Sequence, residues 1–157
     1  MKRLDLLKKK LDVILSCFLV LLLAIMVGVV FLQVVVRSLK GSLPWSEELS
    51  RYLQIYLTLW GIVLLVEKEA LISVDSLFSR VNKKMKRWIQ TFVYLVLAIL
   101  SLFLIYSSFG LVTLTMEQTS PVLKIPMGLV YFAVLSSSIF VFFYNMLHWI
   151  YFRREEK

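Results

Sequence analysis

The ionisable side chains best placed to do chemistry beside an apolar stretch are Glu47, Glu48 and Arg51, which stand between the aromatic residues Trp45 and Tyr52. In a helix either acid can meet the base on one face, because Arg51 follows Glu47 by four residues and Glu48 by three. Charges at the start of an apolar stretch favour a polar contact with a partner or an intrahelical brace at a membrane boundary. The less favoured alternative is an interfacial anchor, in which both aromatic rings join the aromatic belt and the headgroups solvate the charges.

The sequence offers few residues for catalysis or for binding a cofactor. Cys17 is the only cysteine and lies in an apolar run, which is typical of a small buried hydrophobic residue and leaves no thiol relay within one chain. His148 is the only histidine, whereas a membrane haem normally needs axial side-chain ligands. The sequence shows no metal-ligand cluster, nucleotide-binding loop or nucleophile–base pair. We therefore expect no enzyme activity, no cofactor and no metal.

The apolar stretches also lack the groups that usually form a path for an ion or a substrate. Asp, Glu or His at membrane depth normally marks such a path. The deep polar residues here are only Gln33, Gln54, Asn145 and hydroxyl side chains. Clear interruptions by glycine and proline, which build transport sites, are also missing. We therefore expect a helical scaffold that serves a larger membrane partner.

The composition indicates that lipid is the solvent for most of the chain. Its 157 residues are 60% hydrophobic with a mean hydropathy of +0.83, whereas soluble domains are about 45–50% apolar. Each apolar block reaches the roughly 20 residues that a helix needs to cross a bilayer, and helices satisfy their own backbone there. The sequence thus predicts one all-α integral membrane domain over residues 1–157, with four transmembrane helices at about 13–36, 45–66, 88–113 and 126–150.

A charged segment between the second and third spans has an apolar stripe of its own. Leu71, Val74 and Phe78 begin a series that continues at three- and four-residue spacing to Trp88, which is the period of one helix face. We expect residues 71–87 to form an amphipathic helix in the headgroup plane, although a solvated connector with a basic stop-transfer end fits as well. The lipid-interface residues, which would face anionic headgroups, are Lys83, Lys84, Lys86, Arg87 and Trp88.

The distribution of basic residues predicts the orientation in the membrane. Of the 18 Lys and Arg residues, fourteen lie in residues 1–12, 67–87 and 153–157, and four lie in the segments on the other side. Because the side richer in Lys and Arg stays in the cytoplasm, we expect both termini there, in a multi-pass protein of the bacterial inner membrane. The net charge of +8 is then explained by topology and anionic lipid, so no nucleic-acid partner is needed.

Several short motifs resemble one known family. The cluster at the start of the second span is followed by Gly61, by a segment from Ile72 to Asp75, and by Ser120 with Ile125 and Pro126 and then Tyr131. With the four-span layout, this pattern resembles the small membrane subunit of tripartite ATP-independent periplasmic (TRAP) transporters, the DctQ-like family. The chain differs at Leu71, where many members have histidine.

The resemblance implies a role in an import complex. Such a complex uses a sodium gradient to import an organic acid, often a dicarboxylate or sialic acid, which a periplasmic solute-binding protein delivers. A large subunit of many spans holds the substrate and sodium sites, and the small subunit braces it and is expected to help receive the binding protein. The alternatives are a small self-oligomerising exporter or channel, and a membrane enzyme or electron carrier, against which the single histidine and single cysteine speak.

Overall fold

The described part of the chain consists of long helices joined by short segments. A computed structural model describes residues 2–68 and 83–154. Within these residues the helices are α1 (Lys2–Ser38), α2 (Pro44–Glu67), α4 (Lys83–Thr115) and α5 (Met127–Arg154). All four are long and apolar enough to cross a membrane. The prediction of an all-helical protein with four candidate spans is therefore confirmed for the described residues.

The ends of the helices follow from local sequence signals. At the end of α1, Lys40 takes a left-handed φ of 60° and the N–H of Gly41 returns to the carbonyl oxygen of Val36 at 2.9 Å. A Cβ on Gly41 would lie 2.6 Å from a methyl group of Val36, so this close return needs glycine. Pro44 then begins α2 in the first turn, where its missing N–H costs no hydrogen bond.

The segment predicted to lie on the membrane surface is only partly visible. Residues 69–82 lie outside the described residues, and the described part shows no separate interfacial helix. Residues 83–87 instead form the first turns of α4, which begins five residues earlier than the predicted third span. The basic cluster is thus continuous with a membrane-crossing helix.

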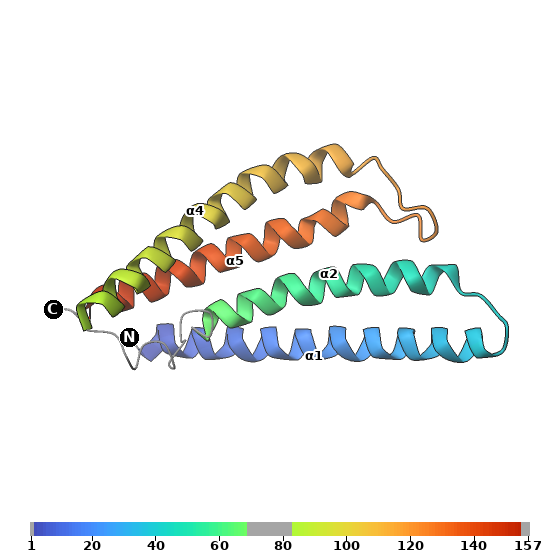
Figure 1. Ribbon diagram of the computed structural model, residues 1–157, viewed down its shortest axis with the longest axis horizontal. Helices are drawn as coiled ribbons and strands as arrows, with labels where there is room; N and C mark the ends of the chain where they lie inside the picture. Colours follow the sequence, from blue (N-terminus) through green and yellow to red (C-terminus); the bar gives the residue numbers. More distant parts are fainter. Residues whose placement is uncertain (1, 69–82, 155–157) are drawn as a thin grey trace.

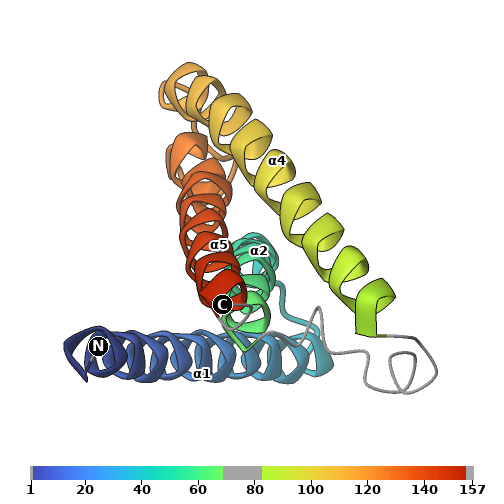
Figure 2. The same cartoon turned by 90° about the vertical axis from the view of Figure 1, so that its left-hand side faces the viewer.

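The helices pack in the order α1, α2, α5, α4. α1 packs against α2, α2 against α5, and α5 against α4, so the two antiparallel hairpins meet through α2 and α5 (Figures 1 and 2). The turn at residues 39–43 and the loop at residues 116–126 lie at the same end of the molecule, and the two chain termini lie at the other end (Figure 1). This arrangement brings residues of α2 close to a loop that follows them by about seventy positions.

The buried contacts are of two kinds. Leu15, Val63, Val66 and Tyr144 form an apolar cluster that joins α1, α2 and α5. Between α4 and α5, Asn145 donates a hydrogen bond from its amide nitrogen to the backbone oxygen of Tyr94 at 2.9 Å. The side of α4 that faces α5 also has small buried residues, among them Ser101 and Ser108, and such residues allow membrane helices to approach closely.

Candidate functional site

The first turn of α2 is held in place by its own backbone and side chains. Ser46 is fully buried, and both its N–H and its hydroxyl donate to the carbonyl oxygen of Leu43, at 3.1 and 2.7 Å. These bonds use the donors of the first turn, which have no partner within the helix. The turn therefore presents the next residues, Glu47 and Glu48, in a fixed direction.

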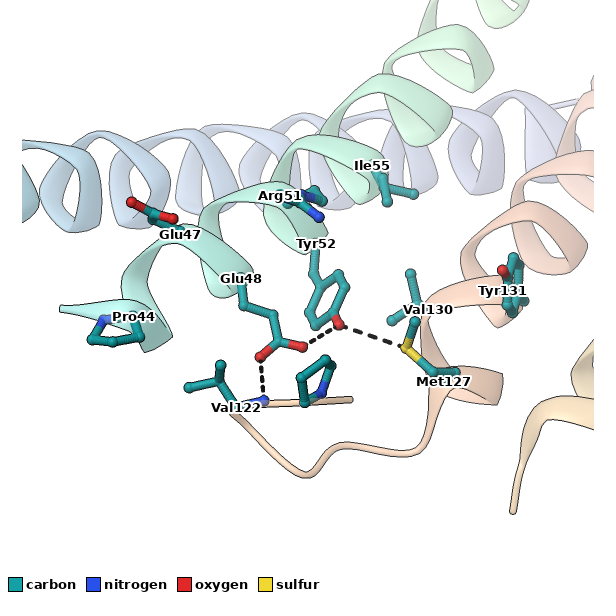
Figure 3. A pocket seen from close by; sticks show the side chains of 11 residues that line it. Pro44, Glu47, Glu48, Arg51, Tyr52, Ile55, Val122, Met127, Val130 and Tyr131 are labelled. Atoms are coloured by element: carbon teal, nitrogen blue, oxygen red, sulfur yellow. Dashed lines mark hydrogen bonds between the residues drawn. The ribbon is translucent and has the colours of Figure 1, made fainter. Parts of the chain in front are cut away.

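Glu48 joins α2 to the loop between α4 and α5. Its Oε1 accepts the hydroxyl proton of Tyr52 at 2.5 Å. Its Oε2 accepts the backbone N–H groups of Val122 at 3.0 Å and of Leu123 at 2.9 Å (Figure 3). Only 9% of the residue is exposed. Its carboxylate therefore forms its hydrogen bonds with protein groups rather than with water. We call Glu48, Tyr52 and the two N–H groups of Val122 and Leu123 the Glu48 junction.

The loop that meets Glu48 has a closed shape of its own. Ser120, which is buried, donates its N–H to the oxygen of Ile125 at 2.9 Å and accepts the N–H of Ile125 on its hydroxyl at 3.2 Å. Lys124 supplies a left-handed turn with φ of 57°, and the N–H of Met127 bonds to the oxygen of Gln118 at 2.7 Å. These bonds direct the N–H groups of residues 122 and 123 toward α2.

Tyr52 and Tyr56 extend the contact between α2 and α5. The Tyr52 hydroxyl has a single proton, which the short bond assigns to Glu48, and the sulfur of Met127 lies 3.5 Å away (Figure 3). One turn further along α2, Tyr56 donates to the backbone oxygen of Leu129 at 2.6 Å. Tyr56 could not be predicted from the sequence, because its acceptor is a backbone oxygen that any residue type would supply.

The other residues of the predicted cluster are not drawn together as their spacing suggested. Arg51 is exposed and makes no ion pair with either acid in the described structure, because Glu48 is occupied by Tyr52 and the loop. Glu47 is exposed and has one long contact, 3.4 Å from the amide nitrogen of Gln33 on α1. Trp45 is half-buried in the first turn. The intrahelical Glu–Arg brace is thus replaced by a brace between α2 and the loop.

The predicted lipid-interface residues lie at the opposite end of the molecule. Residues 83–88 form the start of α4. Arg87 is exposed, and Trp88 has 79% of its surface exposed. The structure thus brings the two predicted groups to different ends of the bundle, consistent with two separate roles.

A hollow lies beside the Glu48 junction. It has a volume of about 430 Å³ and is bounded by α2, by the loop and by the first turns of α5 (Figure 3). The residues that line it include the charged Glu47 and Arg51 and the apolar Ile55 and Val130. No group of three or more His, Cys, Asp or Glu residues that could hold a metal ion occurs in the described part of the chain. The residues that line the hollow offer hydrogen-bonding groups and exposed charges.

Comparisons with a family model and with individual proteins indicate the same family. The family model described as "Tripartite ATP-independent periplasmic transporters, DctQ component" matches residues 26–154. Two Haemophilus influenzae proteins provisionally named TRAP transporter small permease proteins are similar to the chain. One is 29% identical over 143 residues, covering 90% of this chain and 87% of the relative. The other is 30% identical over 121 residues, covering 76% and 75%.

Proposed function

The chain belongs to the DctQ family of tripartite ATP-independent periplasmic transporters, and from this we propose that it braces the large transport subunit of a sodium-coupled importer of an organic acid. As a small permease component it is a non-catalytic, multi-pass membrane protein, and the family implies two partners, a large permease and a periplasmic binding protein. We propose a substrate of the dicarboxylate or sialic acid type. The substrate and sodium would be bound by the large subunit.

The observation that carries the bracing role is the Glu48 junction. The central parts of the four candidate spans, residues 13–36, 52–66, 88–115 and 127–147, contain no Asp, Glu, Lys, Arg or His. The ionisable residues of these helices, Glu48 and His148 among them, lie nearer the helix ends, so the middle of the bundle offers no charged side chain to an ion. The buried carboxylate lies instead at one end, where it ties one hairpin to the loop of the other. A subunit that supports a moving partner must keep its own helices in fixed positions, which the hydrogen bonds of Glu48 help to do. It does not need a site for substrate or sodium.

We propose that the Glu48 junction lies at the periplasmic end of the molecule. The excess of Lys and Arg in the segments at the opposite end supports this orientation, with both termini in the cytoplasm. The exposed residues around the junction, Glu47 and Arg51 among them, would then face the periplasm and could help receive the binding protein. The basic start of α4 would lie at the cytoplasmic leaflet, where anionic lipid attracts it.

The test of the proposed function is assembly. The full chain carrying an affinity tag is expressed together with the large permease subunit of its transporter and is purified in mild detergent. We expect the large subunit to co-purify in equal amounts and the pair to take up substrate when the binding protein is added. A chain that purifies alone from membranes containing the large subunit would contradict the proposal.

A further inference from the structure

α4 has two faces of opposite character. Tyr94, Ser101, Ser108 and Val112 are buried and face α5, the helix against which α4 packs. α4 lies at the edge of the bundle (Figure 2). The opposite face consists mostly of exposed, bulky side chains. We call it the outward face of α4, and it consists of Phe92, Ile99, Phe103, Tyr106, Gly110 and Leu114, which fall on one side of a helix.

Tyr106 has an exposed side chain within the apolar stretch of α4. It has 84% of its surface exposed, and no described residue accepts or donates a hydrogen bond at its hydroxyl. It lies nine residues before Thr115, about 14 Å from the end of the helix. Helical side chains lean toward the N-terminus of their helix, which here directs the ring toward the middle of α4. Hydrocarbon offers no acceptor, so an unpaired hydroxyl that faces lipid tails is costly.

Gly110 makes a notch in the outward face. A Cβ atom at this position would meet nothing within 4 Å, so the contacts within this chain do not explain the glycine. It lies between Tyr106 and Leu114, each four residues away, and both have bulky exposed side chains. A glycine flanked by large side chains lets the backbone of a neighbouring membrane helix approach closely.

The exposed side of α1 differs in kind. Its exposed large side chains include Val20, Val27 and Val34, and its few aromatic ones, Phe18 and Phe31, have no polar group. Lipid tails are as apolar as these side chains, so such a surface gains little from contact with another protein instead of lipid. The outward face of α4 is instead rich in aromatic side chains, as protein interfaces are. It also contains the Tyr106 hydroxyl, which has no hydrogen-bond partner among the described residues.

We propose that the outward face of α4 binds a membrane-spanning helix of the large transport subunit, with an acceptor group opposite Tyr106 and a side chain that fills the notch at Gly110. This inference rests on the proposed function, because the large subunit is the partner to which it assigns the surface. A protein helix fits better than a lipid tail, since only the helix can supply the acceptor.

Photo-crosslinking tests the occupant of the surface. The photoreactive residue p-benzoyl-phenylalanine replaces Tyr106 in the full chain, which is co-expressed with the large subunit and irradiated in native membranes. The matched control has the same residue at Phe31, which is 69% exposed on α1. We expect an adduct with the large subunit from position 106 and little or none from position 31. Adducts only with lipid or with a second copy of this chain, or equal adducts from both positions, would overturn the proposal.

A pair of glycine substitutions gives an independent measurement. Gly110→Leu fills the notch, whereas Gly28→Leu adds the same side chain on α1, where a Cβ also meets nothing within 4 Å. Overpacking at a helix interface should reduce co-purification of the large subunit at least about fivefold for Gly110→Leu, and Gly28→Leu should leave it unchanged. Wild-type co-purification by both variants would overturn this inference alone. Failure of the unaltered chain to bind the large subunit would overturn the proposed function and the inference with it.

Discussion

Glu48→Ala is expected to separate the second helix from the loop and to reduce both the stability of the chain and its assembly with the large subunit. The substitution removes the acceptor for the N–H groups of Val122 and Leu123 and for the hydroxyl of Tyr52. Buried donors that lose their acceptor pay the full cost of desolvation, which exceeds the net value of the bonds themselves. We expect a melting temperature in detergent several degrees lower and a severalfold smaller yield of the complex.

One further variant tests whether the hydrogen bonds of Glu48 or its negative charge matter, and a second serves as a control. Glu48→Gln keeps an oxygen for the two loop N–H groups and can donate its amide to Tyr52, so its loss should be clearly smaller than that of Glu48→Ala. Glu47→Ala is the matched control, because it removes the neighbouring acid, which is exposed and has one long contact. Equal melting temperatures and equal yields for Glu47→Ala and Glu48→Ala would refute a special role for the Glu48 junction.

Gly128→Ala is expected to force apart the ends of α4 and α5. A Cβ at this position would lie 2.9 Å from the backbone oxygen of Val112 and 2.7 Å from the sulfur of Met116. The Met116 side chain can move, but the Val112 oxygen is fixed in α4, so one of the two helices must shift. The cost of such overpacking is about 1–3 kcal/mol, and thermal unfolding of the purified chain in detergent measures it.

Gly28→Ala is the matched control for this substitution. The residue lies within α1, where a Cβ would meet nothing within 4 Å. Alanine favours the helix over glycine by up to about 1 kcal/mol, so this variant should be as stable as the unaltered chain or slightly more stable. If both variants shift the melting temperature in the same direction, the close approach at Gly128 does not matter for stability.

The helices could be predicted from the sequence because their signals are local. The apolar stretches are long enough to span a membrane, and their charges stand only at the ends. The second span was expected at 45–66, and α2 runs from Pro44 to Glu67. The start of α4 at Lys83 was not predicted, since hydropathy marks only the apolar part of a helix, whereas α4 begins in the basic residues before it.

The hydrogen bonds of the site could be predicted only in part. Spacing placed Glu48 and Arg51 on one helix, and that local relation suggested an ion pair. The actual partners of Glu48, apart from Tyr52, are backbone N–H groups 74 and 75 residues away. Backbone donors have no sequence signature, and the loop that directs them is closed by Ser120 and Ile125. The sequence thus singled out Glu48 but did not indicate its hydrogen-bond partners in the loop.

Transport by the chain alone is the most direct test of the idea that it supports a transporter without being one. The purified chain is reconstituted into liposomes by itself, and in parallel together with the large subunit and the binding protein. A sodium gradient is imposed, and uptake of labelled dicarboxylates and sialic acid is followed. We predict no uptake with the chain alone and sodium-dependent uptake of the cognate substrate with the full set. Uptake by the chain alone would contradict the proposed role.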